Sequence, residues 1–189
     1  MSLSYELIAN DGNARRGRVT TRRGTFETPV FMPVGTRGAV IHLDARDYVD
    51  LGMEVVLGNT YHLMLRPGAE VVKNMGGLHS FTNWDGHMLT DSGGFQVMSL
   101  RDNVKIDDQG VDFTSIYDGK KVRFTPEVAV KTQEDLGADI QMVLDVCAAL
   151  PATDDQVITA MKRTHLWAER AKAAHARPDQ ALFGIVQGG

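Results

Sequence analysis

The feature that most constrains the fold is a repeated pattern of five short apolar segments, each ending in glycine or in a polar residue. These segments are almost continuously apolar and do not alternate with polar residues. That is typical of strands buried on both faces, as in a parallel sheet. The five predicted strands are residues 29–35, 54–59, 87–91, 140–145 and 182–187.

Helix start signals lie between the predicted strands. Thr125 is a candidate N-cap followed by proline at the first helical position, and Thr153 forms a capping-box pattern with Gln156. Asp44 is a third candidate N-cap. Strands that alternate with helices predict a parallel sheet with right-handed crossovers. The predicted helices lie within residues 44–52, 125–137 and 153–176.

Two stretches depart from this alternation. The pair Asp118-Gly119 is a turn signal between two apolar runs, so residues 101–124 predict a β insertion after the third strand. Residues 5–27 predict an N-terminal β hairpin. Five arginines fall within residues 15–23 of this hairpin. Such a run is either a solvated face or part of a phosphate-contacting surface.

Polar side chains end four of the predicted strands: Asn59, Asp91, Asp145 and Gln187. Carboxyl ends of strands form the ligand site both in a (β/α)8 barrel and in an open doubly wound sheet. No Gly-x-Gly-x-x-Gly follows the first strand, which disfavours the second fold. A complete barrel needs eight strands and about 250 residues. The sequence therefore predicts an α/β fold, the N-terminal part of a (β/α)8 TIM barrel with about five βα units.

The segment after the third strand is the strongest candidate for a binding site. Asp91 places a carboxylate at a strand end, and Ser92, Gly93 and Gly94 offer backbone amides that a ligand can approach closely. Phe95 adds a flat aromatic face. An acid, free amides and a ring suit a flat polar ligand such as a nucleobase.

The other strand-end residues extend this chemistry. An ionised Asp145 accepts two N–H bonds from a guanine-like edge, and the amide of Gln187 both donates and accepts. Two neighbouring carboxylates can also divide the work of acid and base. Three alternatives stay open: Asp145 as a helix cap, Asn59 as a loop-fixing side chain, and Asp91 with Asp145 as the carboxylate pair of an unrelated glycosidase.

Composition excludes several classes of protein. The chain has 189 residues, 43% of them hydrophobic, which is enough for one domain with a sizeable core. A membrane span and a signal peptide are not predicted. The net charge of −4 disfavours a strongly basic nucleic-acid-binding domain. The single cysteine, Cys147, excludes an intrachain disulfide and fits a reducing cytoplasm. No paired histidine or cysteine spacing indicates a metal site. Cys147 is expected to be a buried residue that lines the pocket.

Several long motifs in this order resemble the N-terminal half of the tRNA-guanine transglycosylases, also called queuine tRNA-ribosyltransferases. The similarity runs through nearly the whole chain. The motifs that carry it lie at residues 28–35, 59–68, 91–97, 144–147 and 183–189.

The resemblance implies a pentosyltransferase on a (β/α)8 barrel that exchanges the wobble guanine of tRNA for a 7-deazaguanine, preQ1 or queuine. Exchange by double displacement requires the base to leave the stack and enter a closed pocket. Asp91 matches the general acid/base, and Phe95 matches the aromatic residue that stacks on the base. The residues expected to bind substrate are Ser92, Gly93, Gly94, Phe95, Asp145, Gln187, Gly188, Asn59 and Cys147.

The resemblance also sets expectations for the rest of the protein. The family's nucleophilic aspartate, C-terminal barrel half and Cys/Cys/Cys/His zinc subdomain are expected to lie outside residues 1–189, so no zinc is expected in this chain and the chain alone is expected to be inactive. A cytoplasmic homodimer is expected at full length. Val146 replaces the family's usual glutamate, while Cys147 is typical of bacterial members that use preQ1. The alternative is a non-catalytic relative that binds tRNA or a partner subunit.

Overall fold

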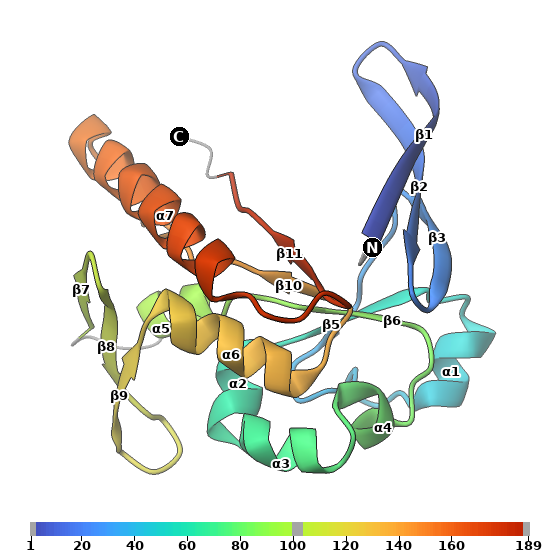
Figure 1. Ribbon diagram of the computed structural model, residues 1–189, viewed down its shortest axis with the longest axis horizontal. Helices are drawn as coiled ribbons and strands as arrows, with labels where there is room; N and C mark the ends of the chain where they lie inside the picture. The colour runs from blue at the N-terminus through green and yellow to red at the C-terminus, as the bar shows by residue number, and fades with distance from the viewer. Residues whose placement is uncertain (1–2, 100–103, 187–189) are drawn as a thin grey trace.

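The computed structural model describes residues 3–99 and 104–186 (Figure 1). Its centre is a parallel sheet with the strand order β11-β10-β6-β5-β4. Strands that follow one another in this sheet along the chain are also neighbours in space, and all of them are parallel. Their bounds are β4 Val34–Gly35, β5 Val55–Gly58, β6 His87–Thr90, β10 Ile140–Met142 and β11 Ala181–Phe183.

The prediction of an α/β fold with a parallel sheet is confirmed. Within the described residues the sheet is open, with β4 and β11 as its edges, so it is not a closed barrel. Along the chain, a helix follows each of the first four strands of this parallel sheet, namely β4, β5, β6 and β10, whereas none follows β11 among the described residues. Of the expected fifth βα unit, the described residues therefore contain the strand β11 and no helix.

The three predicted helices are present with the predicted caps. They are α1 (Ala45–Asp50), α6 (Pro126–Leu136) and α7 (Asp154–Ala174). Asp44 and Thr153 both form complete capping boxes, because the third residue of each helix bonds back to the N-cap backbone. Helix α7 ends two residues before the predicted limit, with His175 as its C-cap.

Four short helices had no clear signal in the sequence. They follow β5 and β6, and each has six residues or fewer. Segments of this length have too few turns for an apolar periodicity to be recognised. Their bounds are α2 Thr60–Leu65, α3 Ala69–Asn74, α4 Leu78–Thr82 and α5 Gly94–Ser99.

The predicted β insertion is present, and its β8–β9 turn contains Asp118-Gly119 as predicted. The N-terminal segment is a three-stranded antiparallel sheet where the sequence predicted a hairpin. Its extra strand is β3, which pairs with β2 through a short turn, and in the insertion β7 pairs with β8. The bounds are β1 Leu3–Asp11, β2 Ala14–Thr21, β3 Gly24–Thr28, β7 Lys105–Asp107, β8 Gly110–Thr114 and β9 Lys121–Phe124. The N-terminal sheet projects away from the rest of the molecule (Figure 1).

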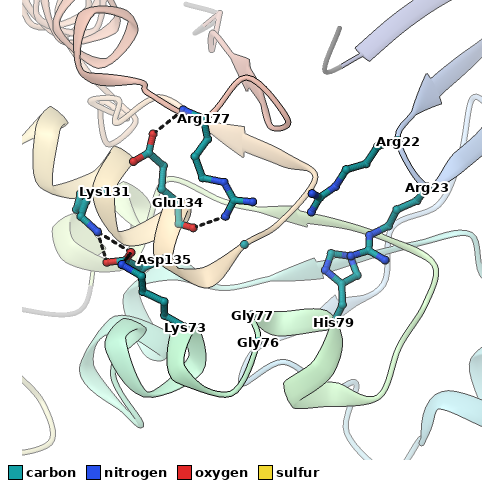
Figure 2. A pocket seen from close by; sticks show the side chains of 11 residues that line it. Arg22, Arg23, Lys73, Gly76, Gly77, His79, Lys131, Glu134, Asp135 and Arg177 are labelled. Atoms are coloured by element: carbon teal, nitrogen blue, oxygen red, sulfur yellow. Dashed lines mark hydrogen bonds and ion pairs between the residues drawn. The ribbon is translucent and has the colours of Figure 1, made fainter.

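A buried carboxylate joins the N-terminal sheet to the amino end of the parallel sheet. Asp139 is 1% exposed and immediately precedes β10. Its oxygens accept bonds from the Met88 backbone N–H at 3.0 Å and from the Arg23 Nε at 3.0 Å, and one lies 3.1 Å from the His79 Nε2. Figure 2 shows Arg23 and His79 converging from different elements. Burial raises the pKa of Asp139, but His79, the Met88 N–H and Arg23 outweigh it and hold the pKa below its usual range.

Ion pairs also involve most of the five arginines at residues 15–23. Arg16 and Arg18 pair with Glu27 on the neighbouring strand, and Arg22 pairs with Asp179 at 2.6 Å. Together with Arg23 on Asp139, these contacts neutralise most of the run within the protein. The solvated-face interpretation fits the outer arginines better than a phosphate-contacting surface does.

Among residues 3–99 and 104–186, no helix has the length and apolar character needed to cross a membrane.

Asp139→Asn is expected to lower the free energy of unfolding by about 3 kcal/mol, because it removes the charge that compensates Arg23 and that accepts the Met88 N–H in a buried site. Asp112 pairs with Arg123 on the surface, so Asp112→Asn is the matched control, with an expected loss below about 1 kcal/mol. Urea unfolding near neutral pH measures both. Because the pKa of Asp139 is lowered, its contribution is present at neutral pH and is lost as the pH falls through that pKa. Equal effects of the two variants would contradict this assignment.

Candidate active site

Asp91 follows β6 directly and is held in place by the start of helix α2. Its Oδ1 accepts the backbone N–H of Thr60 at 2.8 Å and that of Gly93 at 3.1 Å. The Asn59 Nδ2 donates to Oδ2 at 2.5 Å, and the Thr60 hydroxyl donates to the Asp91 carbonyl at 2.6 Å. Three of these four donors, on Asn59 and Thr60, lie at the end of the neighbouring strand β5, and the fourth, on Gly93, lies in the loop after Asp91 itself. The carboxylate therefore has one orientation relative to the sheet edge.

Asn59 combines the two roles that its sequence position allowed. Its Oδ1 accepts the His62 backbone N–H at 3.1 Å and thereby caps α2. Its Nδ2 is then directed at Asp91. The loop-fixing interpretation is therefore confirmed, and the same amide also orients Asp91, because it has both an acceptor and a donor.

The environment of Asp91 opposes its ionisation. Burial raises the pKa of Asp91 to about 6, and the negative charge of Asp145 adds to that rise. The N–H groups of Thr60 and Gly93 and the amide of Asn59 act in the opposite direction but do not cancel the effect of burial. A carboxyl group with a pKa near neutrality can both give up and take back a proton, as a general acid/base must.

Asp145 lies beside Asp91 and belongs to the chain that leaves β10. It is 7% exposed, and its Oδ1 accepts a bond from the Ser92 hydroxyl at 2.8 Å. The Ser92 Oγ in turn accepts the Gly94 N–H at 3.1 Å. Helix α7, which follows Asp145 along the chain, is capped by Thr153. Asp145 is therefore not the N-cap of the helix that follows it along the chain.

Two glycines allow this close arrangement. Gly93 has a φ of +76°, and a Cβ at this position would lie 3.1 Å from the Tyr61 backbone nitrogen. A Cβ on Gly94 would lie 3.0 Å from the Asp145 carbonyl oxygen. Any larger residue would therefore push the loop away from α2 or from Asp145.

A fully buried glutamine connects the strands that carry the two acids. Gln133, on α6, accepts bonds at its Oε1 from the Thr90 hydroxyl at 3.0 Å and from the Met142 N–H at 2.9 Å. Its Nε2 donates to the Met142 carbonyl at 2.8 Å. Thr90 directly precedes Asp91, so the glutamine fixes the ends of β6 and β10 relative to each other. Sequence reasoning missed Gln133, because nothing local distinguishes it from a solvated helix residue.

The two acids border a pocket of about 330 Å³ at the carboxyl end of the sheet. Phe95 is 61% exposed and also contributes to its wall. The apolar part of the lining was not predicted as part of the site. It consists of Met32, Leu57, Leu89, Met142 and Ile185. Acidic groups at the border of an apolar slot are typical of a small-molecule site.

Not every predicted site residue lies in this pocket. Its lining includes Asp91, Ser92, Gly93, Phe95 and Asp145. Asn59 and Gly94 are not part of the lining, but they bond to Asp91 and to Ser92, respectively. Gln187 and Gly188 lie outside the described residues.

Cys147 requires a correction. It is exposed rather than buried, and it lines a separate hollow between the β insertion and α7. The reason is the direction of the chain after β10. Val146 packs into the core cluster around Trp167, so the next side chain turns outward.

A second pocket lies at the opposite end of the strands and has a different character. Its volume is about 420 Å³, and its lining includes Lys73, Lys131 and Arg177 (Figure 2). Asp135 pairs with both lysines, and Asp179 pairs with Arg177. Because its cations are already matched with carboxylates, this pocket functions as an ion-pair network between elements.

Within the described part of the chain, no group of three or more His, Cys, Asp or Glu side chains is arranged to hold a metal ion.

Asp91→Asn is expected to change how stability depends on pH. The folded-state pKa of Asp91 is about 6, above the ordinary value of 3.8 for an aspartate, so the folded protein binds more protons than the unfolded chain between these values. Stability conferred by Asp91 is therefore full below about pH 3.8 and decreases by about 3 kcal/mol in total as the pH rises to above about 6. Asparagine cannot ionise, so the variant lacks this pH-dependent contribution to the free energy of unfolding.

Urea unfolding of both proteins between about pH 4.5 and pH 7.5 measures the difference, in which other titrating groups cancel. Identical pH dependence in the two proteins would contradict the raised pKa.

Comparison with known proteins agrees with the resemblance of the motifs. The family model for queuine tRNA-ribosyltransferase matches residues 11–189. The queuine tRNA-ribosyltransferase of Marinobacter nauticus is 55% identical over 99% of this chain and 50% of its own length. Those of Pseudomonas putida and Rhizobium meliloti are each 54% identical, over 99% and 100% of this chain and 50% of their own lengths.

The chain spans about half the length of the curated relatives that it matches. The matched half carries Asp91 and Asp145 together with the loops that orient them. By the family match and by this extent of identity, the chain belongs to the queuine tRNA-ribosyltransferase family.

Proposed function

We propose that this chain supplies the base-binding and acid/base part of a tRNA-guanine transglycosylase, which exchanges the wobble guanine of tRNA for a 7-deazaguanine. The observation that carries the proposal is the pair of acids beside the apolar pocket. One has its pKa raised to about 6, and the other is held by the Ser92 hydroxyl.

Each group has a distinct task in this proposal. Asp91 donates a proton to the departing guanine and accepts one from the incoming base, because its pKa lies close to neutrality. Asp145 accepts N–H bonds from the edge of the base. Phe95, largely exposed at the pocket wall, stacks on the ring face after the nucleotide has left the tRNA stack. Gln187 and Gly188 are proposed to contact the same base.

The rest of the enzyme is proposed on the strength of family membership. The open edges β4 and β11 would be completed to a (β/α)8 barrel, and the full-length protein would act as a cytoplasmic homodimer that binds tRNA. A zinc site elsewhere in the protein would be structural, and no step in the proposal depends on it. The exposed position of Cys147 leaves the choice between preQ1 and queuine to contacts outside the described pocket.

The second candidate is a non-catalytic relative that binds tRNA or a partner subunit. A binding protein has no need for a partly buried carboxyl group of raised pKa, which costs stability. The retention of Asp91 with four hydrogen bonds around it therefore favours the enzyme. Family membership also removes the unrelated glycosidase from consideration.

In the complete gene product that contains this sequence, Asp91→Asn is expected to lower the rate of guanine exchange at least about 100-fold, since it removes the proton-transfer group. Incorporation of labelled guanine into tRNA measures the rate. Asp85 is exposed and lies just before the same strand, so Asp85→Asn is the control and should exchange normally. Wild-type rates in Asp91→Asn would overturn the role of Asp91.

Asp145→Asn is expected to weaken binding of guanine or preQ1 about 10- to 100-fold, because a neutral amide replaces an acceptor of charge-assisted bonds. Calorimetry with the free base and the complete gene product measures this affinity. Asp155→Asn, an exposed acid in the first turn of α7, should bind normally. Unchanged affinity in Asp145→Asn would limit Asp145 to its bond with Ser92.

A further inference from the structure

A cluster of cationic and aromatic side chains lies beside the acid site and has no task in the proposal above. It consists of Arg37, His62, Arg66 and Tyr117, hereafter the Tyr117 cluster. The Arg37 guanidinium carbon lies 5.8 Å from the centre of the Tyr117 ring, and that of Arg66 lies 6.0 Å from it. Both distances are within the range of cation–π attraction.

Hydrogen bonds to the tyrosine hydroxyl fix the cluster further. The His62 Nδ1 lies 3.0 Å from the Tyr117 hydroxyl oxygen, and the Arg37 Nη2 donates to it at 3.4 Å. Burial lowers the pKa of His62, and the charge of Arg37 adds to this. A neutral His62 either accepts a hydrogen bond from the Tyr117 hydroxyl or donates one to it, depending on its tautomer, while the two guanidinium groups carry the charge.

The cluster differs from the other arginines in the balance of its charge. Within residues 3–99 and 104–186, no carboxylate ion pair involves Arg37 or Arg66, and both residues are exposed. Most other arginines there are neutralised by acids: Arg16, Arg18, Arg22, Arg23, Arg123, Arg163, Arg170 and Arg177. Two oriented and uncompensated guanidinium groups on a protein of net charge −4 form a local site for an anion.

The cluster lies at the same end of the sheet as the pocket. Arg37 is in the segment after β4, Arg66 is the C-cap of α2 after β5, and Tyr117 is in the turn between β8 and β9 after β6. A continuous chain of contacts runs from Asp91 to Asn59, from Asn59 to the His62 backbone, and from the His62 ring to Tyr117.

We infer that the Tyr117 cluster binds the phosphate backbone of the RNA whose base enters the pocket. Guanidinium groups bind phosphate through paired N–H donors, and prior immobilisation on a ring reduces the entropy lost on binding. Phosphate contacts position a nucleic acid without selecting its sequence. The inference rests on the proposed function, because the RNA substrate of that function presents phosphates next to the base in the pocket.

The test measures the affinity of the complete gene product for fluorescent tRNA at several salt concentrations. In the double variant Arg37→Gln, Arg66→Gln we expect about 10-fold weaker binding near 0.1 M salt and a salt slope shallower by about 1.5, since two phosphate contacts are lost. Tyr117→Ala removes no charge but removes the ring that orients both arginines, so it should also weaken binding. Tyr117→Phe keeps the ring and should have the smaller effect.

Two controls make the result specific. Arg123 lies in the same β insertion but is paired with Asp107 and Asp112. The variant Arg123→Gln should therefore change neither the tRNA affinity nor the salt slope. Binding of free preQ1 should be the same in all variants, because the cluster lies outside the pocket lining.

Failure of the inference and failure of the proposed function give different results. Wild-type tRNA affinity and salt slope in the double variant, with normal guanine exchange, would overturn the inference and leave the function intact. Absence of both tRNA binding and exchange in the unmodified gene product would overturn both. A double variant that loses binding of free preQ1 to the same extent would indicate misfolding at α2 and would also contradict the inference.

Discussion

The contact on which the site depends is the set of hydrogen bonds that Gln133 makes with Thr90 and Met142. The amide has no exposed surface, so an unmade bond would leave a buried polar group at a cost of about 1–3 kcal/mol. Full satisfaction is possible in one relative position of β6, β10 and α6. That position brings Asp91 and Asp145 side by side, which makes the register of two strands the origin of the electrostatics of the pocket.

The two ends of the parallel sheet use charge in opposite ways. At the amino end, Asp139 is buried with Arg23 and His79, and its pKa is lowered, so ionisation supports the fold. At the carboxyl end, Asp91 is partly buried, no cation pairs with it among residues 3–99 and 104–186, and its pKa is raised to about 6. The ionised Asp139 stabilises the folded state at neutral pH. The ionised Asp91 destabilises it, but its carboxyl group titrates near neutrality. A strand-based fold can carry both because the strands separate its two ends.

Local signals predicted much of the fold correctly. Thr125, Thr153 and Asp44 cap the helices assigned to them, because a cap depends on a side chain and on backbone groups within three residues. Apolar runs located the strands for the same reason. The short helices after β5 and β6 and the third strand of the N-terminal sheet were missed, since their formation depends on partners that no local pattern identifies.

The sequence by itself determined which chemical groups stand at the strand ends: the carboxylates of Asp91 and Asp145, the amide of Asn59 and the ring of Phe95. Only the tertiary structure decided how those groups behave. It raised the pKa of Asp91 through burial and the nearby Asp145, turned Cys147 outward, and assembled the Tyr117 cluster from three separate segments. The physical reason is that burial, charge proximity and ring contacts arise between residues that lie tens of positions apart in the chain, and such distances in space follow from packing alone.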